Sequence, residues 1–218
     1  MNKAWSELNK TMQAQIKKKD TCEAGIDTLF DLRNQLMETL TSFSEELSRE
    51  EFDAIPFINA DGYHSKTIAY SIWHIFRIED IVAHTLIGED EQVFFAGNYQ
   101  ERINSPIITT GNELVKEQIA DFSKQLNLKE LYAYIFEVKD STEKIIDSLS
   151  YDDLKKKISE ERKEYLKSLN VVSNDENAIW LIDYWCGKDI RGLIQMPFSR
   201  HWIMHIEASQ RIKNRIHS

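Results

Sequence analysis

SKTIAYSIWHIFRIEDIVAHTL, residues 65–86, is the stretch of this 218-residue chain that decides its fold. Apolar side chains recur in it at helical spacing and leave no broad polar face. Gly88 follows, and glycine commonly lies just past the end of a helix. A helix that is apolar nearly all round is expected in the middle of a helical protein, where its neighbours cover it on several sides. We therefore predict a buried central helix with His74 at its midpoint.

Amphipathic patterns on both sides of this segment predict further helices. Apolar residues at intervals of three and four indicate helices over residues 1–18, 23–47, 128–149, 176–186 and 197–216. The chain holds only 7 glycines and 3 prolines, so it is poor in the turn residues that a many-stranded fold needs. We expect a single all-α domain over residues 1–218, with residues 1–20 as an N-terminal helical extension.

Two short signals indicate where helices begin in the second half of the chain. Thr110 is followed by Glu113, and Asn127 by Glu130, which is the spacing of a capping box. The charge-rich residues 152–170 predict a solvated helix or an excursion between core elements, and we assign them no function.

Composition and charge exclude several classes of partner. The net charge of −9 does not fit the positive surface of a nucleic-acid-binding protein. No stretch approaches the roughly 18 consecutive apolar residues of a membrane span, and the polar N-terminus has no signal-peptide run. Cys22 and Cys186 are too few for a disulfide framework. We expect a cytoplasmic protein that binds neither nucleic acid nor membrane.

Two of the six histidines have the spacing of metal ligands. His201 and His205 are four residues apart in the last predicted helix, so both side chains project from one face. That face continues through Ala208, Ile212 and Ile216 and should point into the protein. Two neutral imidazoles placed in this way can bind one divalent ion. The alternative is a pair of core histidines whose nitrogens are hydrogen-bonded.

A third histidine on the central helix strengthens the metal hypothesis. His74 lies among large apolar side chains, and three inward histidines on two helices leave many nitrogens in need of partners. One shared cation satisfies them, and facing helices of a bundle commonly supply such ligands. His84 is an alternative to His74, but it lies near the helix end, where exposure is expected. His64 and His217 are expected at the surface.

At these residues the sequence resembles the DinB-like superfamily of metal-dependent four-helix bundles. The likeness rests on Trp73-His74-Ile75 in the central helix and on the segment S-R-H-W-I-M-H over residues 199–205. It covers about residues 23–216. The resemblance implies that His74, His201 and His205 bind a divalent metal, often zinc or nickel. It also implies a four-helix bundle, here with extra N-terminal and connecting helices.

The resemblance further implies a class of activity. Family members use the metal to transfer low-molecular-weight thiols, or for hydrolysis or isomerisation. Many have a second histidine just before the last ligand and a Gly-Gln after it, where this chain has Met204 and Glu207-Ala208. The departure leaves the ligands intact but does not support any particular activity. We expect a metal-dependent transferase or hydrolase that acts on a small molecule, with a low-molecular-weight thiol as cofactor in the first case.

Residues close to the ligands in the sequence are candidates for substrate binding. Lys188, Arg191 and Arg200 suit an anionic group such as a carboxylate, although surface charge that tunes solubility is the simpler interpretation. The aromatic candidates for an apolar pocket wall, or simply for the core, are Trp73, Tyr184, Trp185 and Trp202. The acidic candidates for orienting an imidazole N–H are Glu79, Asp80, Asp183 and Glu207.

Two other hypotheses remain open at this stage. In one, the metal or the histidines only stabilise the bundle, and the protein is a non-catalytic module that binds a partner. In the other, no metal binds and the histidines are core residues. The amphipathic first helix is a candidate interface for a homodimer.

Overall fold

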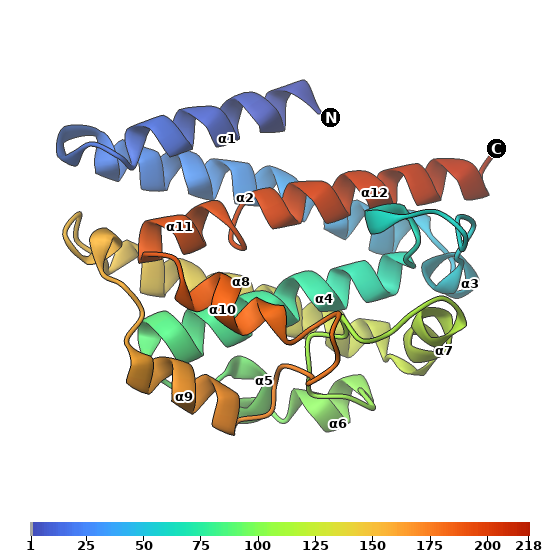
Figure 1. Ribbon diagram of the computed structural model, residues 1–218. Helices are drawn as coiled ribbons and strands as arrows, with labels where there is room; N and C mark the ends of the chain where they lie inside the picture. Colours follow the sequence, from blue (N-terminus) through green and yellow to red (C-terminus); the bar gives the residue numbers. More distant parts are fainter. Residues whose placement is uncertain (1) are drawn as a thin grey trace.

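The computed structural model describes residues 2–218, and within them the chain is helical with no β-strand (Figure 1). The prediction of an all-α protein is confirmed. The long helices are α1 (Lys3–Gln15), α2 (Cys22–Glu46), α4 (Ile68–Asp80), α8 (Leu128–Asp147) and α12 (Arg200–Ile216). The shorter α-helices are α3 (Arg49–Asp53), α5 (Val93–Ala96), α6 (Tyr99–Ile103), α7 (Glu117–Gln125), α9 (Glu160–Ser168), α10 (Trp180–Cys186) and α11 (Ile190–Gln195). Single turns and one wider helix complete the order: η1 (Lys19–Thr21), η2 (Gly62–His64), η3 (Ile81–Gly88) and η4 (Asp153–Lys155).

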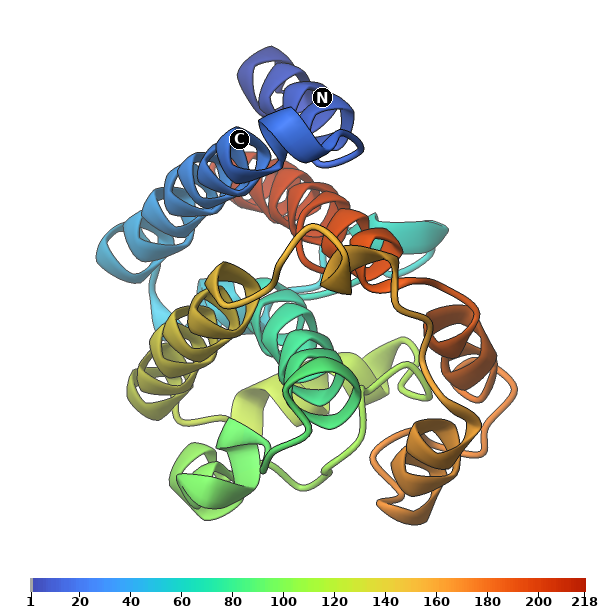
Figure 2. The ribbon, with the colours of Figure 1, turned by 90° about the vertical axis from the view of Figure 1, so that its left-hand side faces the viewer.

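Helix α4 is the centre of the molecule. Every residue from Ile68 to Asp80 is buried, as its apolar sequence predicts. The helix contacts α12 on one side and α8 on another, and α2 packs against both of these neighbours (Figure 2). Helix α1 lies along α2 and buries Trp5 and Met12. Met1, the first residue of the predicted N-terminal helix and extension, lies outside the described residues.

The end of the central helix differs from the prediction. After Asp80 the backbone widens into the π-helix η3, and the left-handed residue that ends it is Glu89, with φ of 59°, rather than Gly88. Gly88 packs closely against α8, because a Cβ there would lie 2.9 Å from Cδ1 of Ile145 and that side chain would have to shift. His84 is buried and not exposed as expected, since its two ring nitrogens are hydrogen-bonded to the side chains of Asp90 and Ser141, at 2.6 and 2.9 Å.

Of the two predicted capping boxes, one begins a helix. The Asn127 side chain accepts a hydrogen bond from the Glu130 N–H and begins α8. The prediction at Thr110 is wrong, because residues 104–116 form a loop and α7 begins only at Glu117. Within the charge-rich segment, α9 lies against η3 as a largely exposed helix. Every helix in the described part of the chain is too short or too polar to cross a lipid bilayer.

Candidate metal centre

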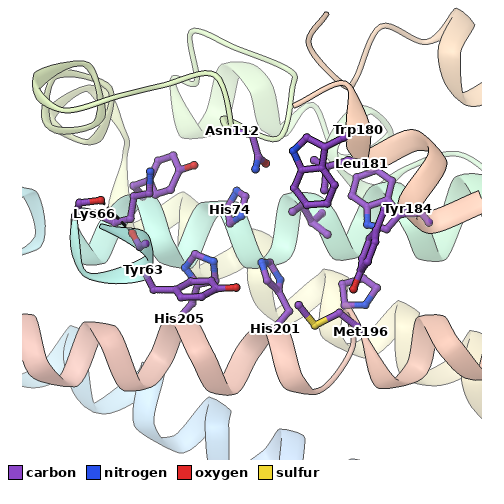
Figure 3. A pocket seen from close by; sticks show the side chains of 16 residues that line it. Tyr63, Lys66, His74, Asn112, Trp180, Leu181, Tyr184, Met196, His201 and His205 are labelled. Atoms are coloured by element: carbon purple, nitrogen blue, oxygen red, sulfur yellow. Dashed lines mark hydrogen bonds between the residues drawn. The ribbon is translucent and has the colours of Figure 1, made fainter. Parts of the chain in front are cut away.

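Three histidines from two helices meet beside a pocket (Figure 3). His74 lies in the middle of α4, and His201 and His205 lie one turn apart at the start of α12. Their ring centroids are 4.6, 4.9 and 5.1 Å apart, and one nitrogen of each ring lies within 4.8 Å of the others. All three residues, which we call the histidine cluster, are at most 6 % exposed.

A hydrogen bond fixes the orientation of His74. Its Nδ1 donates to the backbone carbonyl of Thr110 at 2.7 Å, and Nδ1 carries the proton because a carbonyl oxygen only accepts. In the neutral ring the lone pair is then on Nε2, which is the atom left for a metal. A backbone carbonyl, and not one of the acidic side chains considered from the sequence, orients this imidazole.

Gly111 explains how the loop brings that carbonyl to His74. Its φ is +76°, and a Cβ on it would lie 3.0 Å from Cε2 of Tyr70 and 3.2 Å from a ring carbon of Trp73. The Tyr70 hydroxyl also donates to the Gly111 carbonyl at 2.9 Å. Glycine fits here because the backbone is left-handed and passes close to two aromatic rings.

Burial keeps the histidine cluster neutral. Loss of solvation lowers the pKa of His74 to about 4. It also lowers the pKa values of His201 and His205 well below the usual histidine range, and the neighbouring histidines act in the same direction. The three rings are therefore uncharged at pH 7. Neutral imidazoles are the form of histidine that binds a metal ion.

Two atoms of the histidine cluster have no hydrogen-bond partner in residues 2–218. These are the buried Nδ1 atoms of His201 and His205. A buried polar atom without a partner costs about 1–3 kcal/mol, so the pair is not a satisfied part of the core. Three neutral imidazoles are a donor set that suits zinc or nickel. The cluster thus fits a divalent ion, and no other histidine, cysteine or carboxylate of the described residues joins it.

The histidine cluster faces a pocket of about 540 Å³, a size typical of small-molecule sites. Helix α10 forms an aromatic wall with Trp180, Tyr184 and Trp185. Tyr63 of η2 meets His205 edge to face, with ring centroids 4.8 Å apart. The side chain of Asn112 projects toward His74 from the loop that covers the pocket (Figure 3). The pocket therefore has polar histidine side chains on one side and largely aromatic side chains around them.

Of the seven residues considered from the sequence for substrate binding or the pocket wall, Tyr184 and Trp185 line the pocket, and the other five lie outside its lining. Lys188 and Arg200 line a separate surface depression of about 290 Å³. Arg191 makes an ion pair with a neighbouring aspartate at 3.3 Å. Trp73 and Trp202 are fully buried in the core. Proximity in sequence to the ligands therefore did not place these side chains in the pocket.

The pocket contains residues that the sequence reasoning missed. Lys66, Tyr70, His74 and Ile78 follow one another at intervals of four, and all four line the pocket. This interval, counted back from His74, is the signal that finds Tyr70, whereas Lys66 lies just before the N-cap of α4, where the helical interval no longer applies. Asn112 gave no such signal, because its place depends on the path of a loop.

A second polar group, which we call the ionic cluster, joins the same helices. Arg33 of α2 binds Glu79 of α4 through two nitrogens at 2.7 and 3.0 Å, and its Nε donates to Glu143 of α8 at 2.8 Å. Trp202 of α12 donates its ring N–H to Glu79 at 2.8 Å, and its ring lies 4.3 Å from the Arg33 guanidinium carbon. The ionic cluster thus holds the first turn of α12 against α4, next to His201.

Comparison with known proteins adds no relative. No protein-family model matches the chain, and no curated protein matches it. The case for a function therefore depends on the geometry of the site.

Proposed function

We propose that this protein is a metal-dependent enzyme of the DinB-like type, and that His74, His201 and His205 bind its divalent ion, zinc or nickel. In this proposal α2, α4, α8 and α12 are the four helices of the bundle, and the remaining helices are additions to it. The mutual packing of these helices supports the proposal, as does the placement of the ligands on the two that face each other.

The main observation in support of the proposal is that only three side chains converge on the metal position and that a pocket lies beside them. Structural zinc sites are closed by four protein ligands, whereas catalytic sites commonly use three and leave a position for water or substrate. Here three neutral imidazoles converge, and the space beside them is a pocket of about 540 Å³ and not packed core. This arrangement favours a reacting small molecule over a purely structural metal.

The chain's own residues prepare the site for such chemistry. A divalent ion in this position supplies Lewis acidity, which activates a water or a thiol or polarises a carbonyl. The Thr110 carbonyl holds the His74 ring in one tautomer, and the aromatic side chains of α10 line one side of the site. Transfer of a low-molecular-weight thiol and hydrolysis are the two reaction types to screen.

Elemental analysis of protein purified without an affinity tag tests the metal site. We expect about one zinc or nickel ion per chain, with near-complete loss in His74→Ala, His201→Ala and His205→Ala. Two other histidines are matched controls that should keep the metal: the buried His84, as His84→Gln, and the exposed His217, as His217→Ala. Absence of metal after incubation with divalent ions would show that the histidines are core residues.

Activity is tested separately with the double variant His201→Ala/His205→Ala. Turnover of any thiol-transfer or hydrolase substrate found for the wild-type protein should disappear in this variant. Full activity in the variant overturns the proposed enzyme. A metal that raises the melting temperature without any turnover, or a fourth side chain on the ion, would instead support a metal-stabilised binding module.

A further inference from the structure

Lys66 sets the charge of the pocket. Among the described residues that line it, Lys66 alone has a charged side chain, given that the histidines are neutral. Lys66 is half-buried, burial lowers its pKa, and no carboxylate is among the described residues that line the pocket with it. Ammonium groups away from bulk water are normally paired with an anion. The partner is therefore expected from a ligand.

The Tyr70 ring connects Lys66 to the histidine cluster. Its Nζ lies over the Tyr70 ring, 5.3 Å from the centroid, and the Tyr70 ring in turn stacks on His74 at 5.3 Å and 12°. Lys66, His74 and His205 line the same pocket. A metal ion and Lys66 would together create a positively charged end of the pocket.

The other end of the pocket is apolar. Trp180 and Tyr184 of α10 meet edge to face with centroids 5.5 Å apart, and they remain 49 % and 38 % exposed. Leu181 and Met196 complete this side. Figure 3 shows Lys66 at one end, Trp180 and Tyr184 at the other, and the histidines between them. Large aromatic side chains left exposed beside a pocket commonly contact a ligand.

We propose that the pocket selects small carboxylates with a flat apolar body. The carboxylate lies between the metal position and the Lys66 ammonium, and the apolar body lies against Trp180 and Tyr184. This inference rests on the metal site of the proposed function and goes beyond it by naming the class of substrate. It also moves the anion-binding role from Lys188, Arg191 and Arg200 to a residue in the pocket itself.

Calorimetric titration of the zinc-loaded full-length protein tests this selectivity with three probes. 3-Phenylpropanoate has both features, 3-phenylpropanamide lacks the charge, and acetate lacks the apolar body. We expect 3-phenylpropanoate to bind about tenfold more tightly than either of the other two probes. A tenfold difference in affinity corresponds to the contribution of about one charge-assisted hydrogen bond or one aromatic contact.

Substitutions of Lys66 and Trp180 then test which end of the pocket binds the carboxylate and which binds the apolar body. Lys66→Met should weaken 3-phenylpropanoate roughly tenfold and leave the amide unchanged, and Lys66→Arg should restore most of the loss. Trp180→Ala should weaken 3-phenylpropanoate but not acetate. Lys155→Met is the matched control, because Lys155 also lies over a tyrosine ring, that of Tyr151, outside the pocket lining.

Metal content, measured on the same samples, separates this inference from the proposed function. Equal affinity of Lys66→Met and wild type for 3-phenylpropanoate, with full zinc occupancy in both, overturns the anion site and leaves the metal site standing. A chain that takes up no zinc overturns the metal site. The same comparison of Lys66→Met with wild type, made on the metal-free protein, then decides the anion site alone.

Discussion

The ionic cluster and the histidine cluster both contribute contacts between α4 and α12, yet they differ in how their polar atoms are satisfied. Arg33 and Glu79 are fully buried, and each is held by several bonds from the chain itself. In the histidine cluster His74 has a partner, but the Nδ1 atoms of His201 and His205 have none in residues 2–218.

This contrast distinguishes a structural polar group from a binding site. Buried polar groups in folded proteins are nearly always hydrogen-bonded, and the exceptions call for an explanation. The ionic cluster needs nothing from outside, because its acceptors and donors match. The histidine cluster is complete only with an added ligand, and it lies beside a pocket through which one can enter. The two clusters therefore respond differently to substitution, to acid and to metal.

The largest effect is expected in the ionic cluster. Glu79→Gln leaves the Arg33 guanidinium buried without its main counter-ion, and breaking a buried ion pair in this way costs about 3–5 kcal/mol of unfolding free energy. Denaturant unfolding at pH 7 measures the loss. Glu143→Gln is the matched control and should cost less, about 1 kcal/mol, because the Glu143 side chain is 17 % exposed and water replaces part of the interaction. Equal losses in the two variants would contradict the account of a self-contained pair.

Acid should destabilise the metal-free protein through the histidine cluster. An unfolded histidine has a pKa near 6.5, whereas the folded pKa of His74 is lowered to about 4. The unfolded chain therefore binds more protons in this window, and stability falls as the pH drops from about 6.5 toward 4. His74 alone accounts for about 3 kcal/mol across that window, and His201 and His205 act in the same direction.

Comparison with His74→Leu isolates this effect from the titration of carboxylates elsewhere. We expect the variant, unfolded by denaturant with chelator present, to lose less stability between pH 7 and pH 5 than the wild type. Arg33 should contribute nothing to the difference. Burial opposes its charge, but Glu79 and Glu143 outweigh that effect and raise its pKa. Identical pH dependence in wild type and variant would mean that His74 is not held neutral.

Much of the fold follows from periodicity. The buried helix around His74, the pair on the last helix and the cap at Asn127 are local patterns, and local patterns set helix positions and faces. Thr110 shows the limit of this approach. It has the spacing of a capping box, but the close passage of Gly111 over two aromatic rings holds the segment as a loop.

The site was harder to predict because pockets join distant segments. The three histidines could be predicted because their spacing and their apolar neighbours can be read directly from the sequence. The sequence offered Lys188 and Arg200 as candidates for substrate binding because they are near the ligands along the chain, yet they line another depression. Lys66 lines the pocket from the segment just before α4, one residue before the N-cap Thr67.

The smallest change in the stability of the metal-free protein is expected for a substitution at His201. His201→Leu replaces a buried ring that has an unpartnered Nδ1 with an apolar side chain of similar size. Replacement of an unsatisfied polar group by an apolar one is close to neutral, so the stability of the metal-free variant should stay within about 1 kcal/mol of wild type.

With zinc at 100 times its Kd, the wild type should gain about 2.7 kcal/mol of unfolding free energy and the His201→Leu variant should gain almost nothing. Denaturant unfolding with chelator and with zinc measures both quantities. A loss of several kcal/mol in the metal-free variant would mean that His201 is already satisfied by the fold, as Glu79 is, and that the histidine cluster is core rather than a binding site.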